Sequence, residues 1–105
     1  METVYQDYNE KKYSIIVPHK NSFLLLLKLL DTIPYSPDIE VIVIDDNSNE
    51  EEKKQLKSYR FDDNISIHYH HTSQGAGKAR NIGIEKATGK WLRCLQFGLL
   101  RDLVN

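Results

Sequence analysis

The stretch at residues 40–48, EVIVIDDNS, places an apolar run directly before two carboxylates and two further polar residues. A continuous run of apolar, β-branched side chains is typical of a strand that is buried on both faces of a parallel sheet. The polar cluster then stands at the carboxyl end of that strand, over Asp45, Asp46, Asn47 and Ser48. In open parallel sheets, ligands bind beyond these carboxyl ends. The stretch therefore predicts a buried strand at 40–44 and a candidate site just after it.

Two elements are expected before this strand. Residues 13–17, YSIIV, predict a first buried strand, which Pro18 ends. The following FLLLLKLL segment predicts a helix that starts at Asn21 or Ser22 and stops before Pro34.

Alternating elements are also expected after it. Ser48 and Glu51 have the spacing of a capping box, which predicts a charged helix to about Tyr59. Residues 65–70 alternate apolar and polar side chains, as in a strand with one wetter face near the sheet edge. A glycine-containing loop, a helix to about residue 88 and a fourth apolar run at 91–95 follow. This β-α alternation predicts an α/β fold with a parallel sheet covered by helices.

Composition bounds the function. The chain has 105 residues and a net charge of −1, from 14 basic and 15 acidic residues. This is the size of one domain, and the charge balance excludes a basic domain that binds nucleic acid mainly through phosphate contacts. One cysteine excludes a disulfide framework and is compatible with a reducing compartment. No segment is apolar enough to span a bilayer, and no signal-peptide core is evident, so we expect a cytoplasmic location.

Three segments are expected along the chain. Residues 1–12 are a polar leader, residues 13–95 form the β-α domain, and residues 96–105 are an apolar tail. The leader has no apolar period, as is usual for an untethered terminus.

Asp45 and Asp46 are the first candidate site residues. Two carboxylates at a buried strand end repel each other unless other groups satisfy them. Since neighbouring residues in extended chain face opposite ways, one could point at a ligand while the other holds a turn. A plain strand-to-helix turn, with no ligand, is the alternative.

The segment GAGKARN at residues 75–81 is the second candidate. Gly75 would let a ligand approach the backbone, and a helix start favours an anion. Lys78 and Arg80 add positive charge that suits a diphosphate. The segment lacks the remaining glycines of a Walker loop or a dinucleotide fingerprint. A helix start with solvated charges is the alternative.

Histidines and the cysteine give weaker signals. His68, His70 and His71 fit a wet strand face better than a metal site, because no third ligand has suitable spacing. His19 lies near the expected site without an evident role, and Cys94 fits a small core residue.

Three segments in order, SIIVPHKN at 14–21, EVIVIDDNS at 40–48 and GAGKARNIGIEKATGKW at 75–91, resemble the N-terminal half of glycosyltransferase family 2. The resemblance covers about residues 13–92. It implies a Rossmann-like fold of GT-A type, a three-layer sandwich with a mostly parallel sheet, present here in part. It also implies transfer of a sugar from a nucleotide-diphosphate donor, for which we expect UDP-sugar. Membrane-associated members exist, so peripheral membrane association stays open.

The resemblance also assigns roles to residues. Pro18 would lie against the nucleotide base, Asp46 would accept a hydrogen bond from uracil, and Asp45 would orient the turn. Gly75 and Arg80 match the glycine and arginine that approach the base and the diphosphate, and Lys78 is an added cation there. Lys20 stands where the family often has an aromatic residue, and its aliphatic stem could still cover the base.

The last part of the chain departs from the family pattern. The family carries an Asp-x-Asp motif that binds a divalent metal, Mn²⁺ or Mg²⁺, on the donor diphosphate. It would fall near residues 96–98, which read Gln-Phe-Gly, so no metal ligand is assigned. No catalytic base is identified either. We therefore expect a truncated or frame-disrupted member, incomplete by itself.

Two other classes compete with a donor-binding domain. A non-catalytic nucleotide-binding module, or pseudoenzyme, would keep the base pocket alone. A receiver-like signalling domain would need another strand-end aspartate and a later lysine, and neither is evident. For a truncated sheet we further expect self-association, through its unpaired edge and the tail at 97–104.

Overall fold

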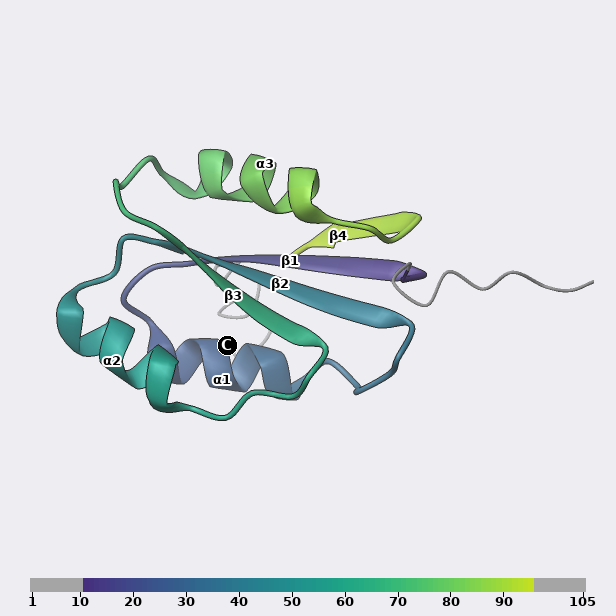
Figure 1. The fold of residues 1–105 in the computed structure, drawn as a ribbon, viewed down its shortest axis with the longest axis horizontal. Coiled ribbons are helices and arrows are strands. Elements are labelled where there is room, and N and C mark those ends of the chain that lie inside the picture. Colours follow the sequence, from purple (N-terminus) through teal and green to yellow (C-terminus); the bar gives the residue numbers. More distant parts are fainter. Residues whose placement is uncertain (1–10, 96–105) are drawn as a thin grey trace, which may run out of the picture.

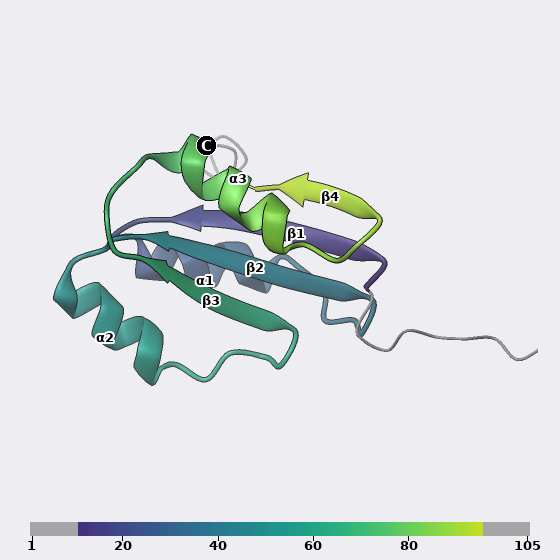
Figure 2. The ribbon, with the colours of Figure 1, turned by 45° about the horizontal axis from the view of Figure 1, so that its top comes forward.

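The computed structural model describes residues 11–95 of the chain. Within them lies one four-stranded sheet whose strands are all parallel and follow the order β3-β2-β1-β4. The strands are β1 (Tyr13–His19), β2 (Ile39–Asp46), β3 (Ile65–His70) and β4 (Trp91–Cys94). Figure 2 shows β3 and β4 at opposite edges, with the arrowheads of β1, β2 and β3 on one side.

Helices cover both faces of the sheet, which gives three layers (Figure 1). The helices α1 and α2 lie on one face, and α3 lies on the other, packed against β1 and β2. Their bounds are α1 (Phe23–Asp31), α2 (Glu50–Ser58) and α3 (Ala76–Lys86). The expected α/β three-layer architecture is therefore confirmed.

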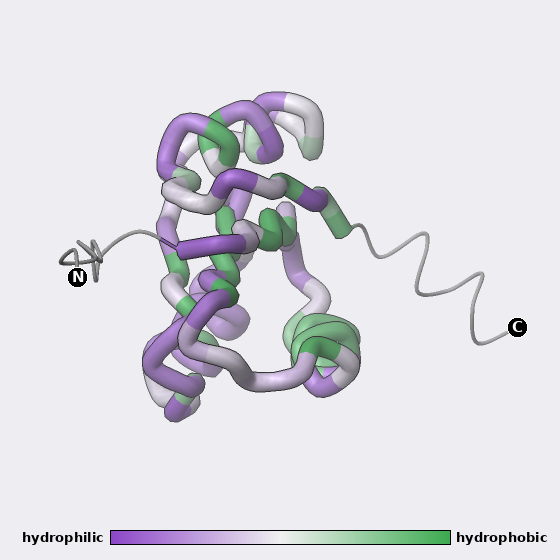
Figure 3. The backbone as a smooth tube through the Cα atoms, turned by 90° about the vertical axis from the view of Figure 1, so that its right-hand side faces the viewer, coloured by the Kyte–Doolittle hydropathy of each residue, from purple (hydrophilic) through white to green (hydrophobic). Residues whose placement is uncertain are grey.

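The middle of β2, residues 41–44, is apolar at every position because helices cover both faces of the sheet. Val41 and Val43 point into the core beneath α1 and α2, whereas Ile42 and Ile44 point into a second core beneath α3. Since successive side chains of a strand face opposite ways, a strand covered on both sides needs apolar residues at every position. In Figure 3 the helix drawn in green is α1, which supplies Leu26 and Leu29 to the first core.

Helix α3 lies close to the sheet because a glycine faces β1. A Cβ built on Gly83 would overlap Cγ2 of Ile16 and lie 3.1 Å from its Cγ1. Both residues are buried. Gly83 therefore sets the distance between the third layer and the sheet.

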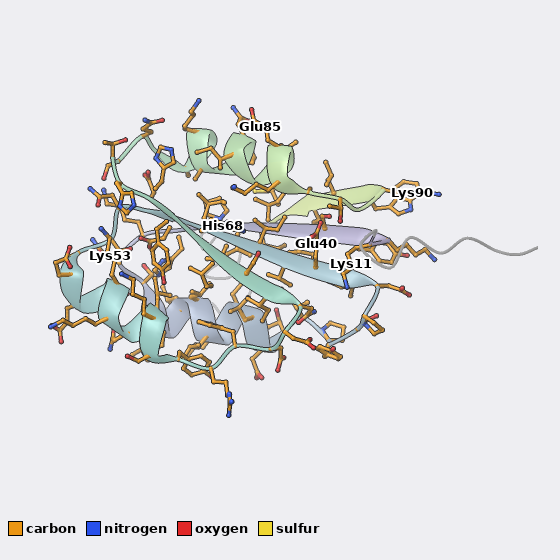
Figure 4. All side chains as sticks on the ribbon, viewed as in Figure 1. Lys11, Glu40, Lys53, His68, Glu85 and Lys90 are labelled. Atoms are coloured by element: carbon orange, nitrogen blue, oxygen red, sulfur yellow. The ribbon has the colours of Figure 1, made fainter. Side chains whose placement is uncertain are left out.

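At the amino end of the sheet, Glu40 joins β2 to the segment that leads into β4 (Figure 4). Its carboxylate accepts hydrogen bonds from Ser14 Oγ and from the Thr88 N–H and Oγ1. Burial alone would raise the pKa of this carboxyl, but the hydrogen bonds from Ser14 and Thr88 outweigh it and lower the pKa below its usual value.

Most sequence expectations for the elements are confirmed, including the position of β3 at an edge of the sheet, and the fourth strand, β4, lies beside β1. The expected capping box is wrong. Asn49, not Ser48, caps α2 by accepting the Glu52 N–H at 2.9 Å, because the Ser48 hydroxyl is held by Asp45. Ser22 occupies the N-cap position of α1 without a side-chain capping bond.

The ends of the chain stay as expectations. The apolar tail at 96–105 and all but the last two residues of the leader lie outside the described residues. Between residues 11 and 95, no helix is long and apolar enough to cross a membrane.

Candidate nucleotide-binding site

Three loops meet at the carboxyl edge of the sheet. They follow the strand ends His19, Asp46 and His70 and lead into α1, α2 and α3 respectively. The carboxyl ends of β1, β2 and β3 lie at the same level of the sheet, because His19 pairs with Asp45 and Asp46 pairs with His70. The loops from β1, β2 and β3 therefore lie side by side, as parallel topology requires.

Asp45 faces away from the third loop and is fully buried. Its carboxylate lies 2.9 Å from His19 Nδ1 and accepts the Ser48 N–H at 3.1 Å, together with the Ser48 hydroxyl. Burial alone would raise the pKa of Asp45, but the hydrogen bonds from His19 and Ser48 lower it below the ordinary value. Asp45 thus organises the turn after β2.

Asp46 faces the opposite way and holds the loop before α3. Its Oδ1 accepts the Gln74 N–H and its Oδ2 accepts the Gly75 N–H, both at 2.9 Å. Its residue surface is only 6% exposed. The two neighbouring carboxylates are therefore separated by their directions, and each is satisfied by a different loop.

Gly75 is the residue that turns the chain into α3. Its φ of 91° and ψ of 162° belong to a region that is almost restricted to glycine. A Cβ would meet nothing within 4 Å, so the backbone angle and not the space requires glycine here.

The start of α3 carries positive charge. Its first turn has no acidic residue and no side-chain cap, and Lys78 and Arg80 are both exposed there. Arg80 also acts on Cys94 at the end of β4, where burial raises the thiol pKa and the Arg80 charge opposes that rise. Together with the helix dipole, these cations favour an anion at the start of α3.

Lys20 crosses the site from the β1–α1 loop. Its ammonium donates to Ser73 Oγ at 2.7 Å, in the loop before α3. The Ser73 hydroxyl in turn lies 3.4 Å from the Asp46 carbonyl oxygen. Lys20, Asp46 and Gly75 are therefore brought together by contacts through one loop.

Pro18 is buried inside β1, in register with Ile44. The Leu95 N–H donates to the Ile16 carbonyl, so the backbone groups of Ile16, and those of Pro18 two residues later, point toward the β4 side. Pairing with β4 ends at Ile16, so the missing N–H of Pro18 breaks no ladder bond. Contact of Pro18 with a base stays a prediction.

Three residues of the site had no binding role assigned from the sequence. His19, Asn21 and Ser48 connect the first two loops: the Ser48 hydroxyl accepts the Asn21 N–H at 2.9 Å, and Asn21 Oδ1 accepts the Asn49 N–H at 2.8 Å. Asn21 has a φ of 50°, which asparagine tolerates better than most residues. The sequence placed His19 at the expected end of the first strand, but its pairing with Asp45 is given only by the strand register.

The divalent metal expected for the family would need a cluster of carboxylate or imidazole ligands. Among residues 11–95, no group of three or more His, Cys, Asp or Glu side chains could hold a metal ion. The segment where an Asp-x-Asp motif would fall, 96–98, lies outside the described residues. His68, a residue of β3, is half-buried, and this burial, aided by the charge of Lys86 on α3, lowers its pKa.

The chain is thus an α/β domain with a parallel sheet, and its candidate site combines an acidic strand end with a cationic helix start at the carboxyl edge. Comparison of the sequence with known families identifies the family to which this α/β domain belongs. The model of the family described as Glycosyl transferase family 2 matches residues 14–96. The chain belongs to this family, whose members transfer glycosyl groups.

Relatives agree with this assignment. An uncharacterized glycosyltransferase of Haemophilus influenzae is 36% identical over 81 residues, which are 75% of this chain and 26% of the relative. The GalNAc(5)-diNAcBac-PP-undecaprenol beta-1,3-glucosyltransferase of Campylobacter jejuni is 32% identical over 88 residues, 80% of this chain and 28% of the relative. The chain thus spans less than a third of these proteins.

Solved structures show the same fold. The crystal structure of Staphylococcus aureus TarS 1-349 in complex with UDP superposes with a TM-score of 0.68 at 28% identity, and covers 89% of this chain and 31% of that one. The complex of TarS 1-349 with UDP-GlcNAc gives the same TM-score at 27% identity, with 89% and 30% covered. The fold is therefore of GT-A type, as expected from the sequence.

Proposed function

We propose that this chain binds the nucleotide of a UDP-sugar donor at the carboxyl edge of its sheet, and so supplies the donor-binding part of a glycosyl transfer. The nucleotide would span the site from the Asp46 carboxylate to the start of α3.

The geometry of Asp46 is the observation that carries the proposal. Each of its carboxylate oxygens accepts one loop N–H, and an ionised carboxylate has about four acceptor positions. One acceptor position per oxygen is left for a ligand. Uracil presents an N–H donor between two carbonyl groups, whereas cytosine presents an acceptor at the same place. A carboxylate therefore favours uracil.

Cationic side chains near Asp46 support binding of the diphosphate part of the UDP-sugar. The Lys20 ammonium donates to Ser73, whose hydroxyl group lies near the Asp46 carbonyl oxygen. Lys78 and Arg80 lie on the first turns of α3. A diphosphate bound at the start of α3 would meet the uncapped N–H groups of the helix and the exposed cations Lys78 and Arg80. Lys20 could donate to a uracil carbonyl group with its ammonium while its stem covers the ring.

Location and self-association belong to the same proposal. The one cysteine, Cys94, is compatible with a reducing cytoplasm, in which we place the reaction, either free or at the membrane surface.

Self-association would use the outer edge of β4, where Trp91 and Leu92 are 64% and 49% exposed. Among the described residues no strand pairs with that edge, and a second copy could extend the sheet there.

Calorimetric titration with UDP, with and without Mn²⁺, tests the proposal. We expect UDP to bind, and Asp46→Asn to weaken binding about tenfold, because it removes a charged acceptor. Asp38→Asn, at the amino end of β2, is the matched control and should bind UDP as the wild type does.

The metal arm separates the two functional classes. Tighter binding with Mn²⁺ indicates a metal-assisted donor site, as in an enzyme. Equal binding with and without Mn²⁺ indicates a nucleotide-binding module. Absence of UDP binding in both arms contradicts the proposed function.

A further inference from the structure

We infer that His19 is a positioning residue of the nucleotide site, which fixes the β1–α1 loop through its Nε2 atom. The inference rests on the proposed function, because that loop carries Lys20. His19 itself is only 2% exposed and does not need to touch the ligand.

The hydrogen bonds of His19 define its tautomer. Nε2 accepts the Ser22 N–H at 3.1 Å, so this nitrogen carries no proton. The proton is then on Nδ1, which donates to Asp45 Oδ1 at 2.9 Å. Glu52 Oε2 lies 3.9 Å from Nε2, beyond hydrogen-bond distance, and instead accepts the Phe23 N–H at 3.0 Å.

This arrangement makes the imidazole a rigid spacer between two loops. One ring nitrogen is attached to Asp45, which the Ser48 N–H holds in the β2–α2 loop. The other nitrogen holds Ser22, three residues further along the chain, at the end of the β1–α1 loop. The loop backbone between the two contacts is Lys20 and Asn21.

Lys20 depends on that loop for its direction. The Ser22 hydroxyl donates to the Lys20 carbonyl at 3.0 Å, so the same residue that His19 holds also restrains the Lys20 backbone. The Lys20 ammonium then reaches Ser73 beside Asp46. Loss of the acceptor at Nε2 would release Ser22 and let the Lys20 ammonium move away from the site.

Two substitutions of His19 separate the hydrogen bond to Asp45 from the hydrogen bond to Ser22. An asparagine amide reaches about as far as Nδ1, so His19→Asn can keep the donor to Asp45 but loses the acceptor for Ser22. A glutamine amide reaches about as far as Nε2, so His19→Gln can keep an acceptor for Ser22 but loses the donor to Asp45. The matched control is His68→Gln on β3, whose Nε2 forms a hydrogen bond with Ser66 Oγ of the same strand at 3.0 Å.

The experiment measures UDP affinity, corrected for the folded fraction, and hydrogen exchange of the Ser22 amide in each variant. We expect His19→Asn to weaken UDP binding about tenfold and to speed Ser22 exchange, and His19→Gln and His68→Gln to stay within about threefold of the wild type. Rescue by glutamine and not by asparagine is not expected of a residue that only stabilises the fold.

The remaining outcomes each decide the matter. Equal UDP affinity in both His19 variants, whether retained or lost, overturns the inference. If the wild-type chain does not bind UDP, the proposed function fails, and Ser22 exchange alone decides whether His19 positions the loop. Unchanged Ser22 exchange in His19→Asn then overturns that claim too.

Discussion

The Asp46 carboxylate accepts the backbone N–H of Gly75 at 2.9 Å, across 29 positions of sequence. This contact joins the end of β2 to the start of α3. It places a carboxylate beside the positive end of a helix, so that groups suited to a base and to a diphosphate lie next to each other.

The conformation of Gly75 gives a first prediction. Gly75→Ala should lower the free energy of unfolding by about 1–3 kcal/mol, because alanine is strained at a φ of 91°. It should also weaken UDP binding, since the N–H that Asp46 accepts would shift. Chemical denaturation and titration measure the two effects. Gly77→Ala is the control and should not destabilise, because its Cβ meets only the end of the Arg80 side chain at 4.0 Å.

The contact between α3 and β1 gives a second prediction. Gly83→Ala should destabilise the protein by about 1–2 kcal/mol, because overpacking against Ile16 exceeds the gain in helix propensity. The midpoint of urea unfolding measures this. If Gly83→Ala raised the midpoint of urea unfolding as much as Gly77→Ala does, this would contradict the close approach of α3 to β1.

Acid stability depends on Glu40. Its pKa is lowered in the folded chain, so its stabilising contribution is fully present above the ordinary value of 4.5 and is lost as the pH falls through the lowered value. Asp45, lowered from 3.8, acts in the same direction. The free energy of unfolding should therefore fall from about pH 5 downward.

Glu40→Gln should make this acid-induced loss smaller, and denaturation curves at a series of pH values measure it. Glu85→Gln, on the exposed side of α3, should leave the pH dependence as in the wild type. An unchanged slope in Glu40→Gln would contradict the assigned hydrogen bonds of Glu40.

The β4 edge gives a prediction on assembly. Trp91→Lys should lower the weight-average mass in sedimentation equilibrium at high protein concentration, because lysine on an edge strand opposes pairing with a second copy. Leu24→Lys is the control, since Leu24 is 72% exposed on the helix α1 and does not belong to an edge strand. A wild-type monomer at every concentration would refute association through β4.

The order of elements could be predicted because it depends on local patterns. The apolar runs around Ile42 and Ile16 required strands covered on both faces, and the alternation at 65–70 indicated an edge strand. The position of the site followed from topology alone, since parallel strands bring their carboxyl ends together.

Contacts over long sequence separations could not be predicted. Ser48 has capping-box spacing, but Asp45 takes its hydroxyl, so Asn49 caps α2 instead. His19 carries no local pattern, and its partners are defined only once β1 lies in register with β2. The fit of Gly83 against Ile16 likewise depends on packing between layers.

The most direct test of the account is the map of amide chemical-shift changes in ¹H–¹⁵N spectra of the full chain on addition of UDP. The account predicts saturable changes at Lys20, Asp46 and the segment from Gly75 to Arg80, with residues at the amino end of the sheet unaffected. Absence of saturable changes, or changes confined to the β4 edge around Trp91, would contradict a nucleotide site at the carboxyl edge.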